Sequence, residues 1–345
     1  MKSLITDRTQ KLKEMALRHG FMGVGVSKAE FMDEEAKRLE EWLSKGYYGE
    51  MAYMANHFDI RVDPTKLMPG AKSVVSLIYN YFPGEAEAKA EAKEGQSPPF
   101  AKRANNDAVI EVEAEGERTD GFKISRYAYG EDYHKVVRRK LKALVAELKE
   151  EVGDMHGRVF VDSAPVMERD WAKRSGLGWI GKNTLLIHPK KGSYFFLAEI
   201  ILDIEFDYDH PIRDHCGTCT KCIDACPTGA ISPEGFVLDA SKCISYLTIE
   251  LKSQIPETFR DKMEDWIFGC DICQEVCPWN RFSTPHKEPA FEMPDHLKKT
   301  NKQDWEEMTE EIFENFFTNS PLKRPGYQKV KDTVKFIRKI NQGNN

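Results

Sequence analysis

The sequence has no apolar run long enough to cross a membrane. Its longest run, from Tyr194 to Leu202, is interrupted by Glu199 and is far shorter than the roughly 20 apolar residues that a membrane-spanning helix needs. Residues 1–20 have an amphipathic helical pattern with acidic residues, and they contain neither an apolar signal segment nor a twin arginine. We therefore expect a cytoplasmic protein without a membrane partner.

An overall excess of positive charge is also absent. The 345 residues include 50 Lys and Arg against 56 Asp and Glu, which gives a net charge of −6. Binding of nucleic acid would therefore have to rely on a local basic patch. A hydrophobic content of 41% is ordinary for a globular protein, and the length predicts two or three structural units.

No cysteine is left over from two metal-binding patterns. The first pattern is C-x2-C-x2-C-x3-C-P at residues 216–227, and the second consists of Cys243 followed by C-x2-C-x3-C-P at residues 270–278. The first is the run by which bacterial ferredoxins bind iron–sulfur clusters, and in such runs the cysteine before the proline binds the other cluster. The eight cysteines therefore predict two [4Fe–4S] clusters, one on Cys216, Cys219, Cys222 and Cys277, the other on Cys226, Cys243, Cys270 and Cys273.

Zinc and disulfide bonds are the alternatives for these cysteines. Zinc favours two separated C-x2-C pairs or mixed Cys/His ligands, which is a different spacing. Disulfide frameworks are typical of short secreted chains, and nothing here indicates secretion.

Local patterns predict the order of the main elements. We expect helices at 7–19, 33–45, 132–151 and 166–175, strands at 72–82, 122–129 and 158–161, and a hairpin over 184–203. Residues 84–119 are rich in Glu, Ala and Lys and predict a mobile surface insertion. The Tyr- and Met-rich stretch 46–57 fits core packing or the lining of a flat ligand.

Two aspartates stand at ends of predicted elements. Asp132 precedes a long helix, where a carboxylate is stabilised by the helix dipole, so we expect a structural cap. Asp162 follows a strand and precedes a loop. Open sheets place catalytic residues at such strand ends, and a purely structural role for this aspartate fits as well. A glycine-rich loop follows at 176–183 and lets backbone approach a ligand, but it lacks the Walker lysine pattern, so we expect no nucleotide site.

The amino-acid composition changes twice in the C-terminal part. Residues 286–320 are acidic with aromatic residues at roughly helical spacing, and residues 322–339 are basic. The basic segment fits either a solvated helix or a contact with a phosphate backbone. The candidates for that contact are Lys323, Arg324, Lys329 and Lys331.

Several motifs together resemble one known family. They are DIRVDP (59–64), SRYAYGEDYH (125–134), VDSAPVMERDWAKRSGLGWIGKN (161–183), GSYFFLAEIILD (192–203), CGTCTKCIDACPTGAI (216–231), CISYLTIE (243–250) and GCDICQEVCPWN (269–280). The chain thereby resembles the epoxyqueuosine reductases, cobalamin-dependent iron–sulfur enzymes of queuosine biosynthesis in tRNA. The third motif is the most specific.

The resemblance implies cofactors, a substrate and site residues. It implies base-off cobalamin near Arg61, Ser125, Asp162 and Asn183, an external low-potential electron donor, and a tRNA carrying epoxyqueuosine in its anticodon loop. The implied reaction takes up two electrons and two protons and releases water, with Asp162 as proton donor. A carboxylic acid shielded from water has a raised pKa that suits this role. His134 is not expected to bind cobalt, because D-x-H-x2-G is not met after Asp132.

The predicted fold class is α+β. We expect a cobalamin-binding α/β sheet domain at 1–210, a ferredoxin-like module at 211–285, and a short helical C-terminal segment at 286–345, in a monomer. The alternatives are another cobalamin and iron–sulfur reductase, such as a reductive dehalogenase, a plain two-cluster electron carrier, and a pure RNA-binding module. The missing twin arginine argues against a dehalogenase, and the net charge argues against an RNA-binding module.

Overall fold

The computed structural model describes residues 2–84 and 121–338. The insertion predicted at 84–119 therefore lies, apart from Gly84, outside the described residues. Within the described ranges, none of the helices combines the length and apolar composition needed to cross a bilayer.

A four-stranded antiparallel sheet forms the centre of the N-terminal half. Its strand order is β1-β2-β7-β4, with the bounds β1 Gly23–Lys28, β2 Ser73–Asn80, β7 Phe195–Leu202 and β4 Gly157–Phe160. The two central strands, β2 and β7, are buried along nearly their whole length because both faces of the sheet are covered.

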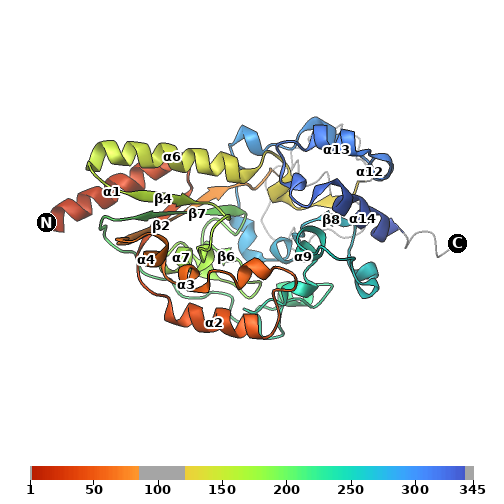
Figure 1. Ribbon diagram of the computed structural model, residues 1–345, viewed down its shortest axis with the longest axis horizontal. Coiled ribbons are helices and arrows are strands. Elements are labelled where there is room, and N and C mark those ends of the chain that lie inside the picture. The colour runs from red at the N-terminus through yellow and green to blue at the C-terminus, as the bar shows by residue number, and fades with distance from the viewer. Residues whose placement is uncertain (1, 85–120, 339–345) are drawn as a thin grey trace, which may run out of the picture.

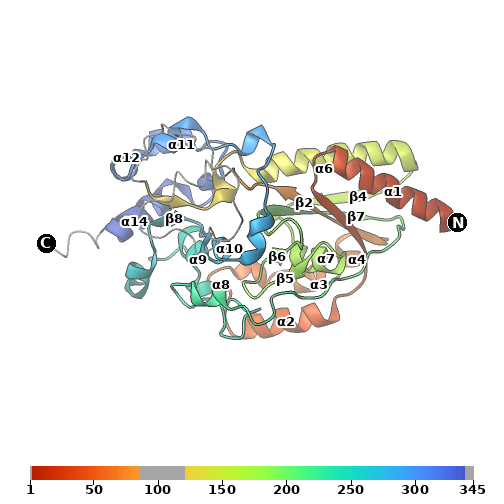
Figure 2. The same cartoon turned by 180° about the vertical axis from the view of Figure 1, so that it is seen from behind.

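Helices cover each face of this sheet (Figures 1 and 2). On one face lie α1 (Lys2–Arg18) and α6 (Tyr133–Val152), which pack against Val75 and Leu77 of β2. On the other face lie α7 (Glu168–Arg174) and α2 (Asp33–Ser44), with the short helices α3 (Phe58–Arg61) and α4 (Pro64–Leu67). The α+β class predicted from the sequence is confirmed.

Most of these helices were predicted correctly from local sequence signals. Helix α1 ends before Gly20, whose φ is +88°, and α2 ends before Gly46, whose φ is +68°. Asp132 caps α6 by accepting a hydrogen bond from the backbone N–H of His134 at 3.0 Å, as its position predicted.

Two strand predictions were wrong in part. The predicted hairpin does turn at residues 189–192, where His188 bridges to Gly192, but its arms do not pair. Instead β6 (Leu186–Ile187) pairs with β5 (Trp179–Ile180), and β7 occupies the centre of the large sheet. The strand predicted at 122–129 is limited to β3 (Lys123–Ile124), followed by the 3-10 helix η2 (Arg126–Ala128).

The cysteine-containing region is made of short elements. They are α8 (Lys221–Asp224), η3 (Ala240–Lys242), α9 (Ile244–Ile249), η4 (Glu257–Lys262), β8 (Trp266–Phe268), α10 (Ile272–Glu275) and η5 (Pro278–Phe282). Strand β8 pairs in parallel with β3, which ties this region to the N-terminal half.

The C-terminal helices pack on two cores, because Phe291 joins the first and the later helices complete a second (Figure 1). Their bounds are η6 (Pro289–Phe291), α11 (Asp295–Lys299), α12 (Lys302–Glu307), α13 (Glu310–Phe316), η7 (Pro321–Lys323) and α14 (Gly326–Arg338). Trp305, Phe313 and Phe317 of this segment pack in one cluster with Trp266 and Phe268 of β8. The expected helical C-terminal segment is therefore present.

Candidate functional site

The eight cysteines lie in the region of α8, α9 and α10, and none forms a disulfide bond. Cys222 lies close enough to Cys216, Cys219 and Cys277 for their charges to interact, and these neighbours together with burial raise the pKa of its thiol to about 11. Burial first, then the charges of Cys243 and Cys226, raise the pKa of Cys270 as well. The structure thus brings together members of each predicted set, and the cluster-ligand assignment itself stays a prediction.

Thiols with raised pKa values do not ionise at neutral pH unless a cation compensates. Iron supplies that positive charge and binds the thiolate form. In the part of the chain that the structure describes, no three His, Cys, Asp or Glu side chains converge on a point suited to one metal ion. A cubane differs from a single ion because each thiolate binds its own iron at a separate corner.

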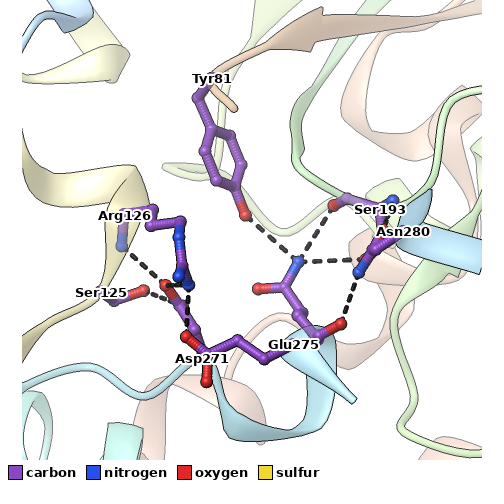
Figure 3. Close-up of polar contacts among 8 residues, drawn as sticks. Tyr81, Ser125, Arg126, Ser193, Asp271, Glu275 and Asn280 are labelled. Carbon is purple, nitrogen blue, oxygen red and sulfur yellow. Dashed lines mark hydrogen bonds and ion pairs between the residues drawn. The ribbon is translucent and has the colours of Figure 1, made fainter. Parts of the chain in front are cut away.

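A polar network joins α10 to the N-terminal half (Figure 3). Asp271 accepts hydrogen bonds from the Ser125 hydroxyl and from the backbone N–H of Arg126, and the Arg126 guanidinium lies 2.6 Å from Glu275. Asp271 and the Arg126 side chain are 1% and 9% exposed, so this ion pair is buried.

The amide of Gln274 extends the same network toward the sheet. It donates to the Tyr81 hydroxyl at 3.3 Å and to the Ser193 carbonyl at 3.2 Å, while Asn280 donates to the Gln274 carbonyl at 2.7 Å. These bonds fix the cysteine-containing helix α10 relative to β2 and β7 (Figure 3).

A cavity of about 330 Å³ lies beside this network. Its wall contains four cysteines, Cys226, Cys243, Cys270 and Cys273, which are the predicted ligands of the second cluster. Ser125 and Asn183, two of the residues expected near a cofactor, line it too, and most of the remaining wall is apolar.

A second cavity of about 310 Å³ lies against the C-terminal segment. Asp132, Tyr133 and His134 form one side of it, and residues 318–321, Lys323 and Arg324 form the other. Tyr127 lines both cavities, so the two are neighbours.

Asp162 contacts two residues of the second cavity. Its carboxylate accepts a hydrogen bond from the Tyr133 hydroxyl at 2.5 Å and lies 3.6 Å from Nε2 of His134. The other ring nitrogen of His134, Nδ1, lies 2.7 Å from Asp132. Tyr133 stacks on Phe196 of β7 with parallel rings 4.1 Å apart, which fixes its orientation.

The electrostatics of this group differ from the expectation for a proton donor. Desolvation alone would raise the pKa of Asp162, but hydrogen bonds with His134 and Tyr133 and the charges of His134 and Arg324 lower it below its usual value. For His134, desolvation acts to lower the pKa, and the contacts with Asp132 and Asp162 outweigh it and raise the pKa to about 9. At neutral pH the proton is therefore held on His134, and Asp162 is a carboxylate.

Two glutamates lie behind Asp162. Glu168, the first residue of α7, accepts a hydrogen bond from the backbone N–H of Asp162 at 2.6 Å. Its side chain also contacts that of Glu199, which lies in the middle of β7 and is 0% exposed. Burial first, then the other negative charges, raise the pKa of Glu168 to about 8 and the pKa of Glu199 well above its usual value.

Arg61 lies away from Ser125 and Asn183, on the side of Tyr53. Its guanidinium donates to the Tyr53 carbonyl at 3.0 Å, and its Nε is buried without a hydrogen-bond partner among the described residues. Tyr53 in turn lies within electrostatic range of Asp162 and Arg324. Arg61 therefore borders the same region as the acid.

The four basic C-terminal candidates differ in their surroundings. Lys323 pairs with Glu314 at 2.7 Å and Arg324 with Glu250 at 2.6 Å, and both remain about half exposed at the rim of the second cavity. Burial lowers the pKa of Lys329. Lys331 donates to the carbonyls of Glu306 and Met308 and so supports the end of α12.

Sequence reasoning missed Tyr133, His134, Glu168 and Glu199 as neighbours of Asp162. A signal existed for one of them, because Glu199 interrupts an otherwise apolar run. A charged residue in a central strand is seldom tolerated without a partner or a role. The contacts of the others depend on how α6, α7 and β7 pack.

Comparisons with known proteins agree on one family. Residues 61–163 match the family model "Epoxyqueuosine reductase QueG, DUF1730", and residues 215–280 match "4Fe-4S double cluster binding domain". The chain therefore carries a domain for two iron–sulfur clusters, and all eight cysteines fall within it.

Relatives over nearly the whole chain carry the same name. The epoxyqueuosine reductase of Cyclobacterium marinum is 52% identical over 97% of this chain and 98% of its own length. That of Escherichia coli is 39% identical over 92% of this chain and 77% of its own length.

Solved structures also match. A crystal structure of an epoxyqueuosine reductase with an epoxyqueuosine-modified tRNA-Tyr stem loop is 31% identical, with a TM-score of 0.79 over 95% of this chain and 80% of that one. A Bacillus subtilis epoxyqueuosine reductase, described with its catalytic aspartate loop swung out of the active site, gives a TM-score of 0.78 at 31% identity over 95% of this chain and 80% of that one. The chain belongs to the epoxyqueuosine reductase family and is an oxidoreductase.

Proposed function

We propose that the protein reduces epoxyqueuosine in tRNA to queuosine, with two [4Fe–4S] clusters and cobalamin as cofactors. One observation carries this proposal. A cavity walled by four cysteines is the neighbour of a second cavity that has Tyr133 and His134, the partners of Asp162, on one side and two basic residues on the other. Predicted cluster ligands, a group that can hold a proton and two basic residues thus lie around two adjacent cavities.

The residues around the first cavity fit one face of a cofactor that combines an apolar ring with polar amide groups. The cavity wall is mainly apolar with a few polar groups, among them Ser125 and Asn183. Arg61 does not line this cavity, and its buried Nε, without a partner in the described chain, is the proposed contact outside it. Ser125, Asn183 and Arg61 are the proposed contacts of cobalamin, with Asp162 close by. Bound cobalamin would supply a low-potential cobalt for breaking the carbon–oxygen bond.

The chain's own residues would manage the proton. Removal of the epoxide oxygen as water needs two electrons and two protons. At neutral pH a proton sits on His134, 3.6 Å from the Asp162 carboxylate, and the Tyr133 hydroxyl donates to the same carboxylate oxygen. We propose that the proton on His134 passes through Asp162 to the departing oxygen, and that His134 then takes the second proton from solvent and passes it along the same route.

Recognition of tRNA is proposed for the rim of the second cavity. Lys323 and Arg324 project there with about half of their side-chain surfaces exposed, and Arg guanidinium groups suit phosphate oxygens. Lys329 and Lys331 complete the proposed set at lower accessibility. A structure of a family member contains a modified tRNA stem loop, which supports a tRNA substrate for this chain.

The deciding experiment is an anaerobic turnover assay. Reconstituted protein, a strong reductant and epoxyqueuosine-containing tRNA are incubated with and without cobalamin, and nucleosides are analysed by mass spectrometry. Cobalamin-dependent formation of queuosine is the expected result. Absence of conversion with bound cobalamin and intact clusters would move the function to another reductase, and absence of cobalamin binding would favour a plain electron carrier.

The role of Asp162 is tested in the same assay. Asp162→Asn should bind cobalamin and tRNA normally and lose turnover by at least about a hundredfold, in line with general acid catalysis. Asp203→Asn is a matched control, because Asp203 lies outside this group and accepts a hydrogen bond from the backbone N–H of His156 at 2.9 Å. Full turnover of Asp162→Asn would remove Asp162 from the mechanism.

A further inference from the structure

Glu168 and Glu199 form a carboxyl pair beneath the turn that presents Asp162, with Glu199 fully buried and Glu168 partly buried. Glu199 points to the same face of the sheet as Ser76 and Phe160, its neighbours in β2 and β4, and this is the face on which α7 packs. Glu168 reaches it from the first turn of α7. The same Glu168 side chain accepts the backbone N–H of Asp162 at 2.6 Å.

This pair needs a proton. Apart from the Glu168 carboxyl, neither oxygen of Glu199 finds a hydrogen-bond partner among the described residues. Two carboxyl groups hydrogen-bond to each other only if one of them is protonated, and two buried like charges in contact are strongly unfavourable.

The surrounding charged residues do not neutralise the two carboxyl groups in place of that proton. The charged groups that act on Glu168 are Asp162, Glu199 and His134, and those on Glu199 are Glu168 and Asp162. On α7 itself, Arg169 is directed to the Thr184 carbonyl, and Asp170 pairs with Arg38. Among the described charges that act most strongly on these two glutamates, the cation is His134, and it is already bound to Asp132 and Asp162.

The backbone of Asp162 depends on the same contact. Its φ of +48° lies in the left-handed region, which an aspartate adopts only at some cost unless neighbouring contacts hold it there. The hydrogen bond to Glu168 is such a contact. We propose that Glu168 and Glu199 share a single proton and that this protonated pair is a latch that positions Asp162. The inference rests on the proposed role of Asp162 in the reaction.

The latch gives a definite direction of pH dependence. Burial raises the pKa of both carboxyl groups, that of Glu168 to about 8, so the pair holds its proton at neutral pH. The last proton is held until pH rises through the pKa of Glu199, which burial and the charge of Glu168 raise well above its usual value; beyond it the two charges repel and the contact with Asp162 weakens. Turnover should then fall on the alkaline side.

The variant Glu199→Gln distinguishes a role of the shared proton from a role of side-chain packing alone. Glutamine has the same shape and keeps an N–H donor for Glu168 at every pH. Above the pKa of the shared proton, wild-type turnover should fall by about tenfold for each further pH unit, as the protonated fraction of a single group does. Glu199→Gln should lose only about twofold by pH 9, the part that comes from deprotonation of His134, whose pKa is about 9. An unchanged alkaline limb in this variant would overturn the latch.

Infrared spectroscopy tests the shared proton without any turnover. In wild-type protein labelled with ¹³C-glutamate, a protonated glutamate carboxyl band that shifts in D₂O should be present at pH 7 and absent in Glu199→Gln. Glu35→Gln is the matched control, because Glu35 is also buried but pairs with Arg174 at 2.9 Å and has a lowered pKa despite its burial. It should leave the band unchanged.

The outcomes for the two proposals are distinct. Absence of the band in wild-type protein would overturn the shared proton whatever the enzyme catalyses. A band together with full turnover of Asp162→Asn would overturn the proposed role of Asp162, and with it the latch as a device for the reaction.

Discussion

Asp162 keeps its negative charge through two neighbours on α6. Tyr133 donates to it at 2.5 Å, and the protonated His134 lies 3.6 Å away. Because each of these partners favours the carboxylate, the acid strength of Asp162 is set by residues that the sequence places 28 or more positions away.

Tyr133→Phe should raise the pKa of Asp162. The variant removes a hydrogen bond to a charged group, a loss of about 1.5–3 kcal/mol, which corresponds to a shift of about one to two pH units. Titration of ¹³C-aspartate-labelled protein by NMR measures it. Tyr208→Phe is the control, since that hydroxyl donates to the Lys72 carbonyl instead. Equal titration curves for wild type and Tyr133→Phe would contradict the geometry.

His134→Gln should make the stability of the protein less dependent on pH. Since the pKa of His134 is raised in the folded state to about 9, its contribution to stability is fully present below about pH 6.5 and is lost as pH rises through about 9. The difference in unfolding free energy between wild type and variant should therefore be up to about 3 kcal/mol at pH 6 and shrink by pH 9.5. Urea unfolding at both pH values measures it. A pH-independent difference would argue against a charged His134.

At the scale of elements, α7 packs unusually close to β1. A Cβ added at Gly25 would lie 2.2 Å from the carbonyl oxygen of Ser175, the residue that follows α7. Only glycine fits there, and this close approach fixes the C-terminal end of α7 against β1, at the end of the helix opposite to Glu168.

Gly25→Ala should destabilise the protein by about 1–3 kcal/mol, the usual cost of overpacking a buried site. Thermal or urea unfolding measures the loss. Gly84→Ala is the control, because an added Cβ there meets only Pro285 at 3.8 Å. A stable Gly25→Ala variant would mean that α7 moves away from the sheet more readily than the packing indicates.

Elements with local signals were predictable, and pairings between distant strands were not. The ends of α1 and α2 follow from Gly20 and Gly46, and the start of α6 follows from Asp132. The partners of β7 did not follow from local sequence. The turn at 189–192 is present, and yet β7 pairs with β2 and β4. A turn sequence fixes a bend, whereas the burial of both faces of β7 decides where that strand lies.

The candidate site follows the same division. Asp162 and the eight cysteines could be found from the sequence because motif and spacing carry the signal. The position of Asp162 at the end of β4 was correct, but the sheet is antiparallel, so the rule for parallel sheets that suggested chemistry there does not apply. The environment of Asp162 comes from three elements that meet only in the folded chain.

At the scale of the whole molecule, the buried ion pair of Arg126 and Asp271 holds the cysteine-containing region to η2 (Figure 3). Arg126→Met leaves Asp271 buried without its guanidinium partner and should cost about 3–5 kcal/mol of stability. Unfolding of the cluster-loaded protein measures this. Lys45→Met, which removes an exposed pair with Glu41, should produce no measurable change. Equal stabilities of the two variants would contradict a structural role for Arg126.

Double substitutions test the two predicted ligand sets. Cys226→Ser with Cys273→Ser removes two ligands of one set, so about half of the iron and sulfide should remain. Cys222→Ser with Cys273→Ser removes one ligand from each set and should abolish both clusters. Iron and acid-labile sulfide analysis after anaerobic reconstitution measures both. Equal iron contents in the two double variants would refute the grouping.

The parallel pairing of β3 with β8 also has a consequence for protein synthesis. Five of the eight cysteines, those from Cys216 to Cys243, precede β8 in the chain, and the helices that cover β8 come later still. During translation, these five cysteines are therefore made before the strand that joins this region to the N-terminal half. Each predicted ligand set also needs a cysteine from 270–277, so neither set is complete until β8 has been made, and the helices of the second core follow last.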